Sequence, residues 1–263
     1  MRDFFLRPTA ESDIEQIIKI WKESFGDSED FILDLAEKCR LIENGVCAES
    51  EGKARAFMFA FDGLEIQGQR ASYIYGLCTQ SEYRKRGLGQ AVAFYAAQQA
   101  SKRGSKLVFL RPADKKLEGW YASVLGAHAF AATLIEKVTP SLPLPDKAIK
   151  ISAEEYLKAR NNSLWRVPAE MIFAEETVHR HYGGAFLRCA DCYICAELCG
   201  NGLFLREIIG HNSALAVSAA AEFFAADEVY LPCHSDDGIA LMFIPPYIPE
   251  NASSIPLMPF TLD

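Results

Sequence analysis

The stretch Arg84-Lys85-Arg86-Gly87-Leu88-Gly89-Gln90 combines residue types that suit the binding of a small anion. Glycine lets the backbone approach an anion without a Cβ in the way, and arginine and lysine add charge-assisted hydrogen bonds. A strand is expected before this stretch and a helix after it, so successive N–H groups and the helix dipole would point into one concavity. The stretch therefore predicts a loop that binds phosphate or pyrophosphate.

The overall charge supports a small polyanion rather than a nucleic acid or a membrane. The net charge is −8 and the pI is near 5.3, whereas nucleic-acid and membrane binding need a basic face. Six basic residues nevertheless gather between Ser81 and Lys106, against the single acid Glu82. The chain contains neither G-x-x-x-x-G-K-[ST] nor G-x-G-x-x-G, so a P-loop and a dinucleotide fold are not expected.

A second candidate is the cysteine series Cys189, Cys192, Cys195 and Cys199, which has the spacing of bacterial iron–sulfur ligands. An electron-transfer or metal protein is the function that this spacing would imply. Residues 185–198, however, alternate like a β-hairpin, and in a strand Cys192 and Cys195 point to opposite faces. The histidines form no strong ligand motif such as H-E-x-x-H. We therefore expect buried cysteines and no metal.

The elements that would position the loop follow from hydrophobic periodicity. Apolar residues at helical spacing predict helices over 14–25 and 31–39, and β-rich segments predict strands over 4–6, 45–50, 54–61, 64–67 and 72–79. Asp62-Gly63 is expected as a hairpin turn. A helix from Gly89 to about Gly104, a strand over 106–110, a helix over 117–125 and a strand over 129–138 complete the order β-α-α-β-β-β-α-β-α-β.

In this order, with Arg84-x-x-Gly87-x-Gly89 between the fourth strand and the third helix, the chain resembles the GNAT superfamily of acyl-CoA-dependent N-acetyltransferases. Their signature is [Q/R]-x-x-G-x-[G/A], and the resemblance covers residues 1–138. It implies an α+β fold with a mixed central sheet flanked by helices, and acetyl-CoA as co-substrate. It also implies that Arg84, Lys85, Arg86, Gly87, Leu88, Gly89 and Gln90 hold the phosphates. The backbone of Leu77, Cys78 and Thr79 would pair with the pantetheine arm and polarise the thioester carbonyl.

The resemblance also implies a catalytic tyrosine. In many members a tyrosine of the fourth helix protonates the thiolate leaving group, and Tyr121 is the match. It precedes Gly126 by five residues instead of the usual four, so Tyr121 either serves this role or points into the core. Tyr73 and Tyr75 are either candidates for the general base or packed aromatics. Glu23 and Asp27 are either contacts for a cationic acceptor or solvated charges.

The second part of the chain is expected to form a smaller domain. We take 1–138 as the GNAT domain, 139–150 as a proline-rich linker and 151–263 as a degenerate GNAT-like α+β domain without R-x-x-G-x-G. Predicted elements are a helix capped by Ser152, a helix with Pro168 at its first position, strands over 185–189, 192–198 and 203–209, a helix capped by Ser213, and strands over 229–233 and 239–244. In similar two-domain acetyltransferases this half shapes the acceptor pocket, and the terminal carboxylate, here of Asp263, can act as a base.

The sequence thus predicts an N-acetyltransferase whose acceptor is an amine of a small molecule or a peptide. The amine attacks the thioester of acetyl-CoA directly. The alternative is a non-catalytic acyl-CoA-binding or sensing module that keeps the loop and loses the chemistry. No metal, nucleic acid or membrane partner is expected, and the first residues, which do not resemble a signal peptide, favour a cytoplasmic protein. The amine and the oligomeric state are left open.

Overall fold

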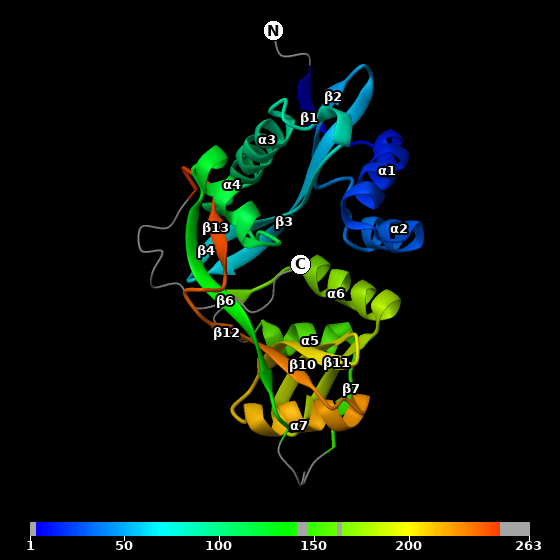
Figure 1. The fold of residues 1–263 in the computed structure, drawn as a ribbon, viewed down its shortest axis with the longest axis vertical. Coiled ribbons are helices and arrows are strands. Elements are labelled where there is room, and N and C mark those ends of the chain that lie inside the picture. Colours follow the sequence, from blue (N-terminus) through cyan, green and yellow to red (C-terminus); the bar gives the residue numbers. More distant parts are fainter. Residues whose placement is uncertain (1–3, 141–146, 162–164, 248–263) are drawn as a thin grey trace. The chain divides into compact units, whose positions relative to one another are not determined.

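The computed structural model describes residues 4–140, 147–161 and 165–247. The described residues form two compact units, one of residues 4–130 with 240–247 and one of residues 131–239. Figure 1 shows the elements of both. Among the described helices, none combines the length and the apolar character needed to cross a membrane. Each unit is described by itself below.

The first unit has a mixed sheet of order β1-β2-β3-β4-β5-β13, in which only the β4–β5 pair is parallel. Along residues 4–138 the observed element order confirms the predicted order, and the sheet confirms the predicted fold class. The bounds are β1 (Phe5–Pro8), α1 (Ile14–Phe25), α2 (Glu29–Lys38), β2 (Gly45–Ser50), β3 (Lys53–Ile66), β4 (Gln69–Thr79), α3 (Leu88–Lys102), β5 (Leu107–Leu110), α4 (Lys115–Leu125) and β13 (Ile239–Phe243).

Alternation along the strands gives this sheet two different faces, covered by α1 and α2 on one side and by α3 and α4 on the other (Figure 1). Trp21 of α1 packs on Phe57, Phe59 and Tyr75, with ring centroids 5.8–6.3 Å apart. On the opposite face, small and aliphatic residues pack against the alanine-rich side of α3. The aromatic face anchors α1, and the flat aliphatic face lets α3 lie close to the strands.

The expectation of a hairpin turn at Asp62-Gly63 was wrong. Strand β3 runs through these residues with a β-bulge, where the register shifts between Asp62 and Leu64 and Gly63 has φ +85°. The Asp62 carboxylate accepts hydrogen bonds from Ser72 and Arg103, which keeps this polar residue within the sheet. The turn lies instead at Gln67-Gly68, where φ is positive at both residues, as a two-residue hairpin requires.

A second bulge lies in β4 and changes the direction of the side chains at the end of this strand. Phe57 is opposite Cys78 and Phe59 is opposite Tyr75, so Gly76 and Leu77 together face Met58. Gly76 has φ +68°, which favours glycine. Because a bulge shifts the alternation by one residue, Cys78 shares the α1 face with Phe57, whereas Leu77 and Thr79 turn towards α3.

The second unit repeats the same plan. Its strand order is β6-β12-β11-β10-β9-β7, and only the β11–β12 pair is parallel. This confirms a second GNAT-like α+β arrangement. The bounds are β6 (His128–Val138), β7 (Ile149–Lys150), α5 (Ala153–Arg160), β8 (Trp165–Arg166), α6 (Ala169–Tyr182), β9 (Gly184–Cys189), β10 (Cys192–Cys199), β11 (Gly202–Ile209), α7 (Ser213–Phe224) and β12 (Val229–His234).

The contacts divide the chain at points other than the expected 138 and 151. Strand β6 pairs with β12 over 133–138, and β13 pairs with β5 of the first unit although it lies late in the sequence. Within the expected linker, Ile149–Lys150 is a strand, and residues 141–146 lie outside the described part. Sequence periodicity identifies strands but does not say which sheet receives them, so the assignment of 1–138 and 151–263 as domains stays a proposal.

Two predicted helix starts are displaced by one residue. Pro168 is the N-cap of α6 rather than its first helical residue, with φ −69° and ψ 156°. Asn212, not Ser213, caps α7, because the Asn212 side chain accepts a hydrogen bond from the Leu215 N–H. The predicted cap of α5 is confirmed, since Ser152 accepts from the Glu155 N–H at 3.2 Å.

We expect Phe243→Ala to destabilise the first unit by about 3–5 kcal/mol. Phe243 of β13 is fully buried and stacks on Phe130 with ring centroids 4.0 Å apart. Urea unfolding measures the loss, and hydrogen exchange should show faster exchange in β5, its partner strand. The control Phe223→Ala, at a side chain 43% exposed, should cost under about 1 kcal/mol. Unchanged protection of β5 would contradict the pairing.

Candidate functional site

A pocket of about 640 Å³ in the first unit is lined by nine of the ten residues predicted to bind the cofactor, and by Tyr121. The nine come from the end of β4, the following loop and the first turn of α3. They are Leu77, Cys78, Thr79, Arg84, Lys85, Gly87, Leu88, Gly89 and Gln90. The same pocket reaches Ser24 and Phe25 at the end of α1, so it touches elements from both faces of the sheet. Residues far apart in the sequence thus converge on one cavity.

This convergence depends on the separation of two parallel strands. Strand β4 pairs with β5 over Ala71–Tyr73, and among the described residues no strand pairs with that side of β4 beyond Tyr73. The other side stays paired with β3 as far as Thr79. The backbone of Leu77–Thr79 therefore borders the pocket as a strand edge, which can pair with an extended amide-containing chain.

The loop ends in a helix start that carries no side-chain cap. Gly87 is the N-cap of α3 with φ +83°, and the first intrahelical bond runs from the Ala91 N–H to the Gly87 carbonyl at 3.0 Å. The N–H groups of Leu88, Gly89 and Gln90 precede that bond, so they are the orphan donors of the first turn. A Cβ on Gly89 would lie 3.3 Å from Thr79 Oγ1. Glycine there lets the helix start approach β4 closely, and an uncapped helix start of this kind can bind an anion.

The three basic side chains of the loop have different surroundings. Arg84 donates to the Thr79 carbonyl at 3.0 Å and lies 3.7 Å from Glu23, so its guanidinium is held beside the strand end. Lys85 is exposed and lines the pocket. Arg86 instead stacks on the Tyr83 ring at 4.9 Å and does not line this pocket. Two of the three predicted cations therefore border the cavity.

Tyr121 lies in α4, 8% exposed, with its ring edge-on to Trp120 at 5.0 Å. Burial raises the pKa of Tyr121 well above its usual value, and the nearby Cys78 raises it further. The side chain is therefore a protonated phenol at every pH near neutrality, which is the form a proton donor needs. The Gln90 amide donates to the Val124 carbonyl at 2.8 Å and ties the start of α3 to α4.

The other candidates have structural partners. Tyr73 and Tyr75 belong to the aromatic face, where Tyr73 packs on Phe109 at 5.4 Å and Tyr75 on Trp21 at 5.8 Å. Glu23 accepts from the Ser81 N–H at 3.1 Å, and Asp27 accepts from the Trp21 indole at 2.7 Å. Asp263 lies outside the described residues.

The cysteine of the site is not a nucleophile at neutral pH. Cys78 is 2% exposed, and burial raises the pKa of its thiol to about 12, although a hydrogen bond from Ser24 and the charge of Arg84 act in the opposite direction. A thiol with such a pKa is almost wholly protonated at pH 7, so chemistry at this site does not depend on a cysteine thiolate.

Sequence reasoning missed several residues that line the pocket. Leu117, Trp120 and Val124 come from α4, and Ser24 and Phe25 from the last turn of α1. Their helical spacing around Tyr121 was a usable signal for the α4 residues, because positions three and four apart share a helix face. Ser24 and Phe25 carry no such local signal, because the bulge at Gly76 is what brings Cys78 to the α1 side.

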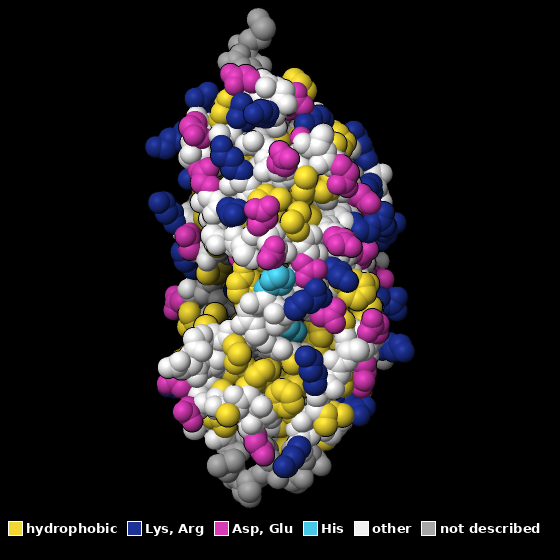
Figure 2. Space-filling model, turned by 90° about the vertical axis from the view of Figure 1, so that its right-hand side faces the viewer, with side chains coloured by type: hydrophobic (Ala, Val, Ile, Leu, Met, Phe, Trp, Pro, Cys, Tyr) yellow, Lys and Arg dark blue, Asp and Glu magenta, His cyan; other side chains and the backbone are white. Residues whose placement is uncertain are grey.

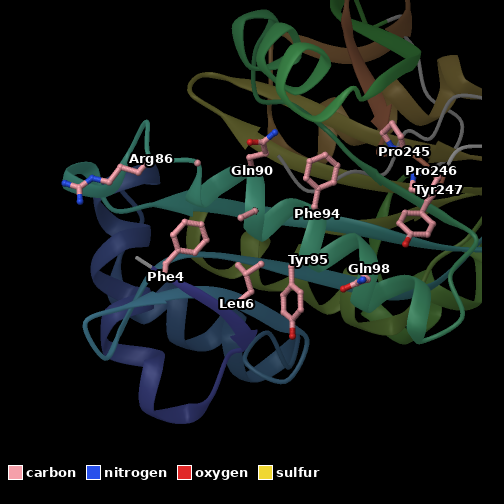
Figure 3. A pocket seen from close by; sticks show the side chains of 12 residues that line it. Phe4, Leu6, Arg86, Gln90, Phe94, Tyr95, Gln98, Pro245, Pro246 and Tyr247 are labelled. Atoms are coloured by element: carbon pink, nitrogen blue, oxygen red, sulfur yellow. The ribbon is translucent and has the colours of Figure 1, made fainter. Parts of the chain in front are cut away.

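A second pocket of about 580 Å³ lies along the outer side of α3 (Figure 3). Arg86 stands at one end and Pro245, Pro246 and Tyr247 at the other, while Phe94 and Tyr95 project from α3 between them. Gly87 and Gln90 line both pockets. The two cavities therefore share lining residues at the start of α3.

Comparison with known proteins relates the first unit to one family of enzymes. Residues 6–121 match the family described as Acetyltransferase (GNAT) domain. The fold is similar to that of a GCN5-related N-acetyltransferase from Kribbella flavida, with TM-score 0.68 and 17% identity over 92% of this chain and 71% of that chain. It is also similar to a GCN5-related N-acetyltransferase from Anabaena variabilis, with TM-score 0.73 and 14% identity over 91% and 72%. No curated protein sequence is significantly similar to the chain. Residues 6–121 thus match a GNAT acetyltransferase domain, as the motif indicated, and the chain shares the fold of these solved acetyltransferase structures.

We expect Gly87→Trp to weaken acetyl-CoA binding at least 100-fold, about 2.7 kcal/mol, because the indole would fill the cavity at the helix start. A matched control exists in Gly68→Trp, at the turn before β4. Both glycines have positive φ, +83° and +77°, and no atom within 4 Å of an added Cβ, so the backbone strain should be alike. Calorimetric titration measures binding. Equal affinity of the two variants would contradict the position of the site.

Proposed function

We propose that this acetyltransferase domain is an acetyl-CoA-dependent N-acetyltransferase that transfers the acyl group to an amine by direct attack on the thioester. The observation that carries the proposal is one cavity bordered by the free edge of β4, the uncapped start of α3 and Tyr121. A strand edge suits the amides of pantetheine, and a helix start beside Arg84 and Lys85 suits the pyrophosphate.

Residue roles follow from where each group lies. The amides at Leu88, Gly89 and Gln90 and the side chains of Arg84 and Lys85 hold the phosphates, and the amides at Leu77–Thr79 orient the thioester. The amine attacks the carbonyl carbon, a C–N bond forms and the C–S bond breaks. The departing thiolate takes the proton of Tyr121, which solvent replaces, and the amine nitrogen loses one proton to water.

The described residues that line the cavity include no obvious general base. Among the described residues that border it, there is no Asp, Glu or His. We infer that the acceptor arrives as the neutral amine or loses its proton through water. The acceptor is an amine of a small molecule or a peptide. On the face drawn in Figure 2, basic and acidic side chains are intermixed, which suits a small acceptor better than a nucleic-acid backbone.

A second candidate function is a non-catalytic acyl-CoA-binding or sensing module. Tyr121 favours it in one respect, since the ring is 8% exposed and packs on Trp120 like a core residue. Such a module would bind acetyl-CoA, and Gly87→Trp would weaken that binding as it would in an enzyme. The module would, however, show no turnover. Release of free thiol in the presence of a panel of amines separates the two functions.

We expect Tyr121→Phe to lower kcat by about 10²- to 10³-fold while the KM for acetyl-CoA changes little, because only the proton donor is lost. The control Tyr95→Phe removes a hydroxyl from a ring that packs on the same core and should keep the wild-type kcat. Steady-state assays of thiol release measure both. An unchanged kcat in Tyr121→Phe would remove the catalytic role and leave Tyr121 as a packing residue.

The pH dependence of the rate should follow the pKa of the acceptor amine rather than the pKa of a residue in the pocket. Because no described carboxylate or imidazole borders the cavity, kcat/KM should rise with pH until the amine itself is neutral. The raised pKa of Tyr121 means that its proton is retained across this range. Two acceptors whose amine pKa values differ by about two units should give profiles of kcat/KM against pH whose midpoints differ by the same amount. A shared midpoint near pH 7 would instead reveal a protein base.

A further inference from the structure

A buried cluster of metal-ligating side chains lies in the second unit, away from the cavity described above. Glu175 and His179 are four residues apart on α6 and share one helix face. Cys195 and Glu197 are two residues apart on β10 and share one face of the strand. Helix α6 covers that face of the sheet (Figure 1). The four side chains therefore meet between the helix and the strand. Their donor atoms all lie within 4.8 Å of one another.

The distances within the cluster match the edges of a tetrahedral metal site. Cys195 Sγ lies 3.5 Å from Glu175 Oε1 and 3.7 Å from His179 Nε2, and these last two atoms are 3.3 Å apart. Ligand bonds of 2.0–2.3 Å from a tetrahedral Zn²⁺ place neighbouring O, N and S donors about 3.3–3.6 Å apart. Three donors thus already stand close to the spacing that a metal would impose.

One buried atom of this cluster lacks a partner. Glu175 is fully buried, and its Oε2 is a buried side-chain oxygen for which the structure gives no hydrogen-bond partner. An unpaired carboxylate oxygen in the interior costs free energy that a bound cation would recover. The donor set of imidazole, thiolate and carboxylate is the one that Zn²⁺ uses in proteins.

The charges of the cluster balance with a divalent cation. Arg206 is the cation beside the two carboxylates, lying 3.3 Å from Glu175 and hydrogen-bonded to Glu197. Two carboxylates, one thiolate and Arg206 sum to −2, which a divalent ion neutralises.

The surrounding chain is shaped around the histidine. A Cβ on Gly184 would lie 2.6 Å from His179 Cδ2, and Phe186 packs edge-on against the imidazole with centroids 4.7 Å apart. His179 also lines a pocket of about 250 Å³. The register of β11 shifts opposite Cys195, so Arg206 is an extra residue there, and this bulge turns Arg206 towards the cluster.

We propose that Glu175, His179, Cys195 and Glu197 form a structural site for a divalent transition metal of the Zn²⁺ class, which ties α6 to β10. All four ligands come from the protein and are held between helix and sheet, which is the closed arrangement of structural sites rather than the open one of catalytic sites. Arg206 supports Glu197 from outside the ligand set. On binding, the protons of Cys195 and of any protonated carboxyl pass to solvent, so the site loads more readily at higher pH.

This proposal departs from the sequence-based expectation of no metal, and it does not use the iron–sulfur spacing. Cys192 points to the opposite face of β10, into the aliphatic core under α7, as strand alternation predicted. Of the spaced cysteines, Cys195 alone is a ligand here. The competing explanation is that Arg206 and a shared proton stabilise the carboxylates without any ion.

Cobalt titration of the chelator-treated full chain tests the proposal, because Co²⁺ bound to a thiolate gives a charge-transfer absorption band. We expect one equivalent to bind with this band and with tetrahedral d–d bands, and Zn²⁺ to displace it. Cys195→Ser should lose the band and bind cobalt at least about 100-fold more weakly, since loss of outer-shell partners alone costs 10- to 100-fold. The matched control Cys192→Ser, buried in the same strand on the other face, should keep both.

Circular dichroism of each variant shows whether it is folded, and His179→Gln gives a second ligand variant if Cys195→Ser does not fold. Folded wild-type protein that binds no cobalt, or binds it without the charge-transfer band, would overturn the proposal. A band that survives in Cys195→Ser would overturn it as well, because another cysteine would then be the ligand.

Discussion

The separation of β4 from β5 after Tyr73 is the constraint on which the proposed acetyl-CoA site depends. A continuous parallel pair would use the amides of Leu77–Thr79 within the sheet and leave no edge for a ligand. The bulge at Gly76 turns Leu77 and Thr79 towards α3, so that Gly89 can approach Thr79 closely. The strand edge and the helix start thus become two sides of one cavity.

The two units share a topology but differ at the corresponding helix start. In the first unit α3 begins after Gly87, which has no side chain to accept from the first turn. In the second unit the Asn212 side chain accepts from the Leu215 N–H, and the segment between β11 and α7 has only three residues, Gly210, His211 and Asn212. Capping uses one of the donors that a phosphate would need. A shared fold therefore does not imply a shared ligand, and the buried cluster under α6 gives the second unit a different chemistry.

Much of this arrangement could be predicted from the sequence, because the decisive signals are local. Helical spacing in Ile14–Phe25, alternation in Gly45–Ser50 and the glycines of the loop each depend on neighbouring residues. What the sequence concealed depends on pairing between distant segments. The bulge at Asp62-Gly63 resembled a turn because Asp-Gly favours one, and only the partners Ser72 and Arg103 keep it in the sheet.

The same limit applies to the strands and to the buried cluster. Nothing local marks Ile239–Phe243 as a partner of β5, since an apolar strand fits many sheets. Glu175 and His179 show a helical i, i+4 spacing and Cys195 and Glu197 a strand i, i+2 spacing, but each pair by itself is common. The two pairs come together only because α6 packs on β10. The burial of the four side chains likewise depends on tertiary packing and cannot be seen in the sequence.

Amide protection on addition of acetyl-CoA tests the central claim most directly. Hydrogen exchange resolved to single amides should show slower exchange at Leu88, Gly89 and Gln90 and at Leu77–Thr79, with the second unit unchanged. That pattern would place the phosphates at the helix start and the pantetheine along the edge of β4. Protection at other segments, or no change at saturating acetyl-CoA, would contradict the account.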